Sequence, residues 1–203
     1  MAEPDWRQER KSGMLVIAAS IAISGIIWIA LWRLLPPLVG METVGARMLV
    51  ALKCVAFATL FCFVAGIESV AHERLQSNAF DPLLGHETKR LRINLRYLQN
   101  TLEQLTVFAV GLFGLAAYLD SGSAMRIVVA STIVWILNRF AFWIGYHRSA
   151  AMRGLGAPSM LIGLMTLLYV VARIGGDIGG TAGGVIAIAL FLALEAVLFL
   201  KTR

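Results

Sequence analysis

The sequence predicts an all-α fold, a polytopic transmembrane helical bundle, and three observations carry this prediction. Of the 203 residues, 59% are hydrophobic and only 15% are charged, and the mean hydropathy is +0.77. Soluble domains usually carry about a quarter charged residues. The apolar residues fall into runs that approach the ~20 residues needed to cross a bilayer, joined by short links. This balance excludes a disordered chain, a disulfide scaffold and an ordinary soluble enzyme.

Six apolar runs predict six spanning helices, at about residues 14–35, 46–68, 92–119, 124–147, 156–173 and 184–200. Residues 1–13 form a predicted cytoplasmic tail, and residues 14–200 form a single integral membrane domain. A glycine-rich stretch over residues 175–184 predicts a flexible turn before the last run, which is marginal in length. The first run follows basic residues as a signal peptide does, but it is long and no small-residue cleavage site follows. We therefore expect a retained helix.

Lysine and arginine residues are distributed unequally between the two sides of these runs. Twelve lie in the tails and loops of one side and four lie on the other. Because cytoplasmic loops carry the excess of Lys and Arg, both termini are predicted to face the cytoplasm of what we expect to be a bacterial inner membrane. This placement accounts for the net charge of +6 without nucleic acid, since the chain has no soluble basic module. The scattered histidines and cysteines predict no metal site.

The third run opens with a stripe of polar side chains on one helical face. Arg92, Arg96, Asn100 and Glu103 are spaced by four, four and three residues, so a helix presents them on the same side. Glu103 lies about two turns inside the run, where a lone carboxylate is costly. Arg139 lies at a matching depth in the fourth run, and we expect a buried ion pair between the two. Such a pair would either stabilise the packing of the two helices or form part of a functional site.

The predicted cytoplasmic side collects several groups of this kind. Guanidinium groups bind carboxylates in a bidentate manner, and a guanidinium beside a thiol favours the thiolate. Arginines with an amide and a carboxylate therefore suit a small peptide that carries two carboxylates and one ammonium, such as glutathione. The apolar helix faces beside these groups would admit a lipophilic second substrate from the bilayer. The groups on this side are Arg74, Arg96, Arg153, Asn100, Glu103, Tyr146 and His147.

Three segments share the motifs of one membrane family. Residues 96–104 (RYLQNTLEQ) place an Asn four residues after an Arg and a Glu three residues further on. Residues 138–146 (NRFAFWIGY) place a Tyr seven residues after an Arg, and Arg153 follows in the next loop. Residues 73–82 (ERLQSNAFDP) place an Arg before an Ala-Phe pair. Together these segments resemble the MAPEG family (membrane-associated proteins in eicosanoid and glutathione metabolism), which includes microsomal glutathione transferases.

The resemblance covers about residues 46–173 and implies a four-helix core, with an extra N-terminal helix and a probable extra C-terminal helix outside it. It implies a homotrimer with glutathione, the co-substrate, bound between neighbouring subunits near the cytoplasmic face. By position, it assigns thiolate stabilisation to Arg153 and the role of the buried helix arginine to Arg139. It assigns the glutathione contacts to Arg74, Arg96, Asn100, Glu103 and Tyr146.

The function expected from the resemblance is a glutathione-dependent transferase or peroxidase acting on a lipophilic electrophile. The chain departs from the prostaglandin E synthase branch of the family at two positions. Gln99 replaces an arginine before the Asn, and Gly154 replaces a serine after the loop arginine. A prostaglandin activity is therefore not implied.

The residues favour an enzyme, but two other functions stay open. The absent serine favours a non-enzymatic membrane protein of the same fold that binds a lipid or a protein partner. A transporter or channel would use Glu103 and Arg139 as a relay or gating pair, but the chain shows no internal repeat and no pair of broken helices.

Overall fold

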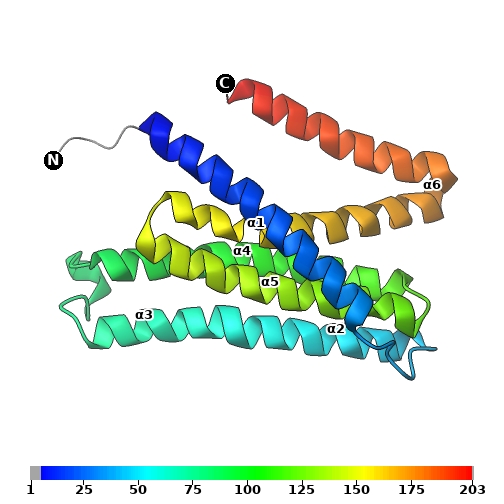
Figure 1. Ribbon diagram of the computed structural model, residues 1–203, viewed down its shortest axis with the longest axis horizontal. Coiled ribbons are helices and arrows are strands. Elements are labelled where there is room, and N and C mark those ends of the chain that lie inside the picture. The colour runs from blue at the N-terminus through cyan, green and yellow to red at the C-terminus, as the bar shows by residue number, and fades with distance from the viewer. Residues whose placement is uncertain (1–5, 203) are drawn as a thin grey trace.

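The computed structural model describes residues 6–202, and every regular element in that range is helical. Figure 1 shows α2 and α3, α4, α5 and the first part of α6 side by side in a bundle, with α1 crossing it obliquely. The predicted all-α bundle is confirmed. The elements are α1 (Trp6–Leu34), α2 (Val44–Ala58), the π-helix η1 (Thr59–Val64), α3 (Ala65–Leu75), η2 (Pro82–Leu84), α4 (Lys89–Tyr118), α5 (Gly122–Arg148), the 3₁₀-helix η3 (Ala151–Gly156) and α6 (Ala157–Lys201).

Most helices begin and end close to their predicted positions. Helices α4 and α5 lie within three residues of the predicted bounds at each end. Helix α1 begins earlier, so residues 6–13 of the predicted tail are helical, while residues 1–5 lie outside the described residues. The second predicted helix continues as one rod through η1 and α3 to Leu75. Threonine or serine side chains cap the starts of α2, α4 and α5 by accepting a backbone N–H, which fixes where these helices begin.

Five helical stretches of the described chain are long and apolar enough to cross a bilayer, and the last of them is bent into two limbs. Inside α6, Gly179 (φ −128°, ψ 22°) and Gly180 (φ 61°, ψ −158°) leave helical geometry, and the chain turns back there (Figure 1). The backbone angles of Gly180 are essentially accessible only to glycine. The limbs meet closely, because a Cβ atom on Gly183 would collide with the carbonyl oxygen of Gly175. In place of the flexible turn predicted over residues 175–184, the helix breaks at two residues.

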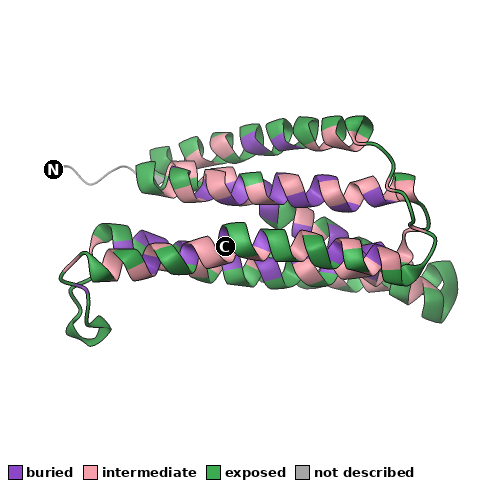
Figure 2. Cartoon of the chain, turned by 90° about the horizontal axis from the view of Figure 1, so that it is seen from below, coloured by how far each residue is buried: buried purple, intermediate pink, exposed green. Residues whose placement is uncertain are grey.

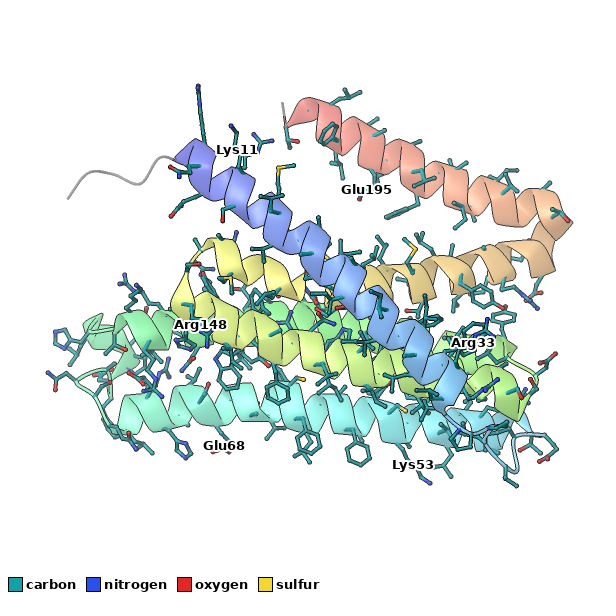
Figure 3. The ribbon with its side chains drawn as sticks, in the orientation of Figure 1. Lys11, Arg33, Lys53, Glu68, Arg148 and Glu195 are labelled. Carbon is teal, nitrogen blue, oxygen red and sulfur yellow. The ribbon has the colours of Figure 1, made fainter. Side chains whose placement is uncertain are left out.

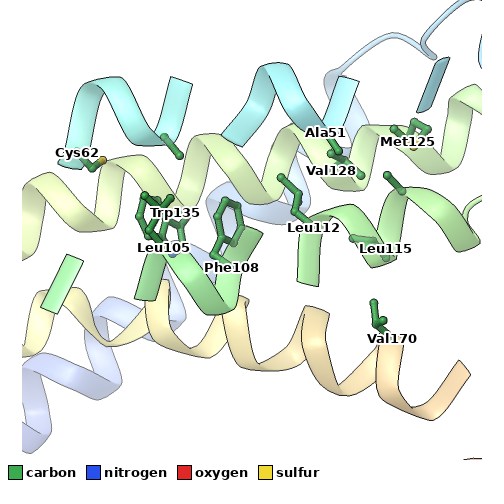
Figure 4. Packing of buried hydrophobic residues seen from close by; sticks show 12 residues of the cluster. Ala51, Cys62, Leu105, Phe108, Leu112, Leu115, Met125, Val128, Trp135 and Val170 are labelled. Carbon is green, nitrogen blue, oxygen red and sulfur yellow. The ribbon is translucent and has the colours of Figure 1, made fainter. Parts of the chain in front are cut away.

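The core lies between the helices of the bundle. Figure 2 shows the buried residues as stripes on helices whose other faces are exposed. At the centre, the rings of Phe108 and Trp135 stack with centroids 4.9 Å apart (Figure 4). Helices α4 and α6 approach closely, because a Cβ atom on Gly114 would lie 2.5 Å from the side chain of Val170. Small residues allow such contacts between membrane helices, where packing replaces the hydrophobic effect as the driving force.

The π-helix η1 is anchored to α4 beside the polar stripe. The Tyr97 hydroxyl donates to the carbonyl oxygen of Cys62 at 3.1 Å, and this hydrogen bond satisfies a carbonyl of the π-helical turn. Gly66 leaves room for the Tyr97 ring, which stacks on Trp143 of α5 at 4.5 Å. These contacts fix the relative positions of α3, α4 and α5 beside the polar stripe of α4.

The helix ends that the charge count assigns to one side of the membrane lie at one end of the bundle. Helix α1 begins at the end where α3 ends, α4 begins and α5 ends (Figure 1). Figure 3 shows Lys11 and Arg148 toward this end and Arg33 toward the opposite one. This arrangement agrees with the alternating helix directions that the charge count assumes.

Candidate functional site

A cavity of about 710 Å³ opens near the end of the bundle where α4 begins, bounded by α1, α4, α5, η3 and α6. Five of the predicted site residues line it, and they come from three different elements. Arg74 does not line it. The five residues are Arg96, Asn100, Glu103, Tyr146 and Arg153.

The polar stripe of α4 is held together by side-chain hydrogen bonds. Arg96 Nη1 donates to Gln99 Oε1 at 3.3 Å, and Gln99 Nε2 donates to Glu103 Oε1 at 3.2 Å. Gln99 therefore bridges a cation and a carboxylate that are both solvent-accessible. Gln99 and Gly154, the two positions at which the sequence departs from the prostaglandin E synthase pattern, both line the cavity.

Asn100 is held in one orientation by neighbours from two helices. Its Oδ1 accepts from Arg139 Nη1 at 3.0 Å and from Gln104 Nε2 at 3.3 Å. Gln104 Oε1 in turn accepts from the Ser159 hydroxyl of α6 at 2.8 Å. Because both hydrogen bonds go to the carbonyl oxygen of Asn100, its amide nitrogen is left to donate to a bound molecule. Gln104 and Ser159 are supporting residues that the sequence reasoning missed, although Gln104 follows Asn100 at helical spacing.

Arg139 is fully buried, but it does not form the predicted ion pair with Glu103. Its guanidinium donates to Asn100 Oδ1 and to Thr101 Oγ1, the latter at 2.7 Å. It also lies 4.6 Å from the ring centroid of Phe142 and 5.3 Å from that of Tyr97. Among the described residues, no salt bridge joins it to a carboxylate. Aromatic faces and neutral oxygen atoms therefore surround this buried cation.

The geometry of α4 explains why the ion pair is absent. Successive residues of an α-helix are rotated by about 100°. Thr101 therefore lies about 100° from Asn100 in one direction, and Glu103 lies about 60° from it in the other. The Arg139 fork extends toward Thr101, whereas Glu103 turns to the cavity. Equal depth in the bundle was the basis of the prediction, and it does not fix this rotation.

Glycines place the loop arginine over the cavity. A Cβ atom on Gly145 would collide with the carbonyl oxygen of Met152, and one on Gly156 would lie 2.7 Å from the Phe142 side chain. Because glycine has no Cβ atom at these two positions, η3 can fold tightly against the end of α5. Arg153 on η3 then lies with Cζ 5.8 Å from the centroid of the Tyr146 ring.

Helix α1 forms a side of the cavity that the sequence did not predict. Its first turns contribute Glu9, Arg10, Gly13, Met14 and Ile17 to the lining. The available signal was the spacing of Ser20, Ser24 and Trp28, four residues apart and thus on one helical face. All three make hydrogen bonds to the bundle.

Arg74 and His147 stand apart from the cavity. Arg74 lies in the last turn of α3, and its Nε atom is buried without a hydrogen-bond partner among the described residues. His147 Nε2 lies 2.9 Å from Asn94 Oδ1, which also accepts from the Trp143 indole at 3.0 Å. Within the described range, no group of His, Cys, Asp and Glu side chains has the arrangement of a metal site.

The fold and the site define an integral membrane protein, a helical bundle with a charged cavity near one end. The sequence model of the MAPEG family matches residues 48–175, well over half of the chain. The protein therefore belongs to the MAPEG family. The match begins in α2 and ends in the first limb of α6, so α1 and the second limb lie outside it, close to the predicted boundaries. Comparison with curated proteins and with solved structures gave no significant match.

Proposed function

We propose that the protein is a glutathione-dependent transferase or peroxidase that acts on a lipophilic electrophile. One observation carries this proposal: a single cavity brings the motif of α4 together with Tyr146 and Arg153, which are distant in sequence. Family membership supports the same chemistry, because the family includes glutathione transferases.

The cavity groups match the charges of glutathione. Arg96 would bind a carboxylate, Glu103 would bind the ammonium group, and the Asn100 amide would donate to a peptide carbonyl. Arg153 beside Tyr146 would lower the pKa of the bound thiol, whose proton leaves to solvent. In the transferase reaction, the thiolate sulfur attacks an electrophilic carbon, forming a thioether as the leaving group departs with the bonding electron pair.

A second cavity provides space for the lipophilic substrate. It measures about 540 Å³, lies between α1, α4, α5 and α6, and is lined mostly by apolar side chains. It adjoins the first cavity, because Ile17 and Ala157 line the first, while Ile21 and Pro158 line the second. An apolar tail held there would direct its electrophilic end toward the thiolate.

The proposal includes a homotrimer in the inner membrane with both termini in the cytoplasm. The charge distribution supports this orientation. Arg74, which does not line the cavity of its own chain, would then contact glutathione across a subunit boundary.

Calorimetric titration of the purified protein with glutathione tests the proposal. Wild type should bind at millimolar concentrations or below, Arg96→Ala should not, and Arg153→Ala should bind without the ultraviolet absorption of the thiolate. Failure of the folded wild type to bind millimolar glutathione would refute it.

The second candidate is a lipid-binding protein of the same fold without turnover. The apolar cavity beside α1 favours it, since a lipid chain fits that lining. It predicts that lipid co-purifies and that no electrophile is consumed with glutathione present. A relay function for Glu103 and Arg139 loses its basis, because the two side chains do not pair.

A further inference from the structure

Helix α1 lies outside the region matched to the family, yet it lines the cavity that holds the family motifs. Arg10 and Glu9 reach the cavity from the first turns of α1, together with Gly13, Met14 and Ile17.

Specific contacts hold α1 in this position. Ser24 Oγ donates to Asn138 Oδ1 at 3.0 Å, and the Trp28 indole donates to Ser131 Oγ at 3.0 Å. Near the cavity, Ser20 Oγ donates to the carbonyl oxygen of Gly154 at 3.3 Å. Gly154 also permits the close approach, because a Cβ atom there would lie 2.9 Å from Ile17 Cγ1. The residue after the loop arginine is therefore a contact point for α1.

The charges supply the chemical reason for this arrangement. Without α1, one chain places two guanidinium groups at the cavity, those of Arg96 and Arg153. Glutathione in its thiolate form carries three negative groups, namely two carboxylates and the sulfur. Arg10 raises the number of guanidinium groups at the cavity to three, so each negative group has a possible cationic partner. Because α1 also contributes Glu9 to the lining, two carboxylates, those of Glu9 and Glu103, are present for the single ammonium group.

We infer that α1 is a wall of the thiol-peptide site and that Arg10 is a further binding residue, which contacts one carboxylate of glutathione. This inference rests on the proposed function for the identity of the ligand. It assigns to the extra helix a direct part in binding, supplied by the same chain that carries the family motifs.

Calorimetry with glutathione compares Arg10→Ala with Lys11→Ala, the adjacent exposed cation that does not line the cavity. Arg10→Ala should weaken binding about tenfold, equivalent to ~1.4 kcal/mol, and Lys11→Ala should leave it unchanged. Two analogues, each lacking one carboxylate charge, identify the contact. Wild type should lose affinity for both, and Arg10→Ala should bind the analogue that lacks the Arg10-contacting carboxylate as it binds glutathione.

A cross-link tests whether the wall belongs to the same chain. A Cβ atom on Gly13 would lie 3.9 Å from Ala151 Cα, so Gly13→Cys with Ala151→Cys should form a disulfide within one chain. A disulfide between chains would overturn the inference.

The outcomes separate the inference from the proposed function. If wild type binds and Arg96→Ala does not, while Arg10→Ala matches Lys11→Ala, the proposed function stands and the inference about α1 fails. If wild type does not bind, both fail together.

Discussion

Replacing Glu103 by Gln should separate a binding role from a structural one. The carboxylate is exposed to the cavity and accepts one hydrogen bond, from Gln99 at 3.2 Å. Gln retains the shape and an acceptor oxygen, so the free energy of unfolding should change by less than about 0.5 kcal/mol. For a chain of this size, that corresponds to a shift in Tm of about 1–2 °C or less. A buried ion pair would instead lose about 3–5 kcal/mol when one partner is removed.

The same substitution should have a large effect on glutathione binding. A hydrogen bond to a charged group contributes about 1.5–3 kcal/mol, so losing the contact with the ammonium group should raise Kd by roughly 10- to 150-fold. Heat denaturation followed by circular dichroism measures the first effect, and calorimetry measures the second.

A double-mutant cycle completes the test of Glu103. Combined with Arg139→Met, Glu103→Gln should show an interaction energy within about 0.5 kcal/mol of zero, because the two side chains share no hydrogen bond. An interaction energy above about 1 kcal/mol would refute this account of the site.

Three substitutions and one control test the packing of the bundle, each by its effect on the free energy of unfolding. Gly122→Ala places a Cβ atom against the carbonyl oxygen of Leu38 and should cost at least about 1–3 kcal/mol, whereas Gly25→Ala, with open space around it, should change stability by less than about 1 kcal/mol. Tyr97→Phe removes the hydroxyl that donates to a carbonyl of η1 and should cost about 1–3 kcal/mol. Gly180→Ala strains a backbone with φ 61° by about 1–3 kcal/mol. An unchanged Tm in any of the three would contradict the packing described.

The helices and their order follow from the sequence because long apolar runs and terminal charges are properties of the chain itself. The register of Arg96, Asn100 and Glu103 could be predicted for the same reason, since the period of one helix fixes which residues share a face. The partner of Arg139 could not be predicted in this way, because it depends on how α4 and α5 are rotated about their axes. The sequence indicates how far along its helix a residue lies, but it does not indicate how the helix is rotated about its axis.

Two other features also depend on contacts between elements. Many glycines between Gly175 and Gly184 have a local propensity to break a helix, so the sequence alone does not single out Gly179 and Gly180. The path of α1 across the bundle was not predicted, because the spacing of Ser20 and Ser24 indicates a shared helical face but does not identify Asn138 and Gly154 as their partners.

The way in which α1 is attached determines how an apolar molecule would reach the second cavity. Lipid tails solvate a separated apolar helix well, so its departure is opposed by close packing, such as that of Gly154 against Ile17, and by side-chain hydrogen bonds, which between membrane helices average about 0.6 kcal/mol each. The single hydroxyl proton of Ser20 also has the carbonyl oxygen of Ile17 within reach at 2.9 Å, so Ser20 keeps an acceptor within its own helix when it loses Gly154. An apolar molecule that entered the second cavity past α1 would therefore have to break these contacts, because α1 forms one side of that cavity.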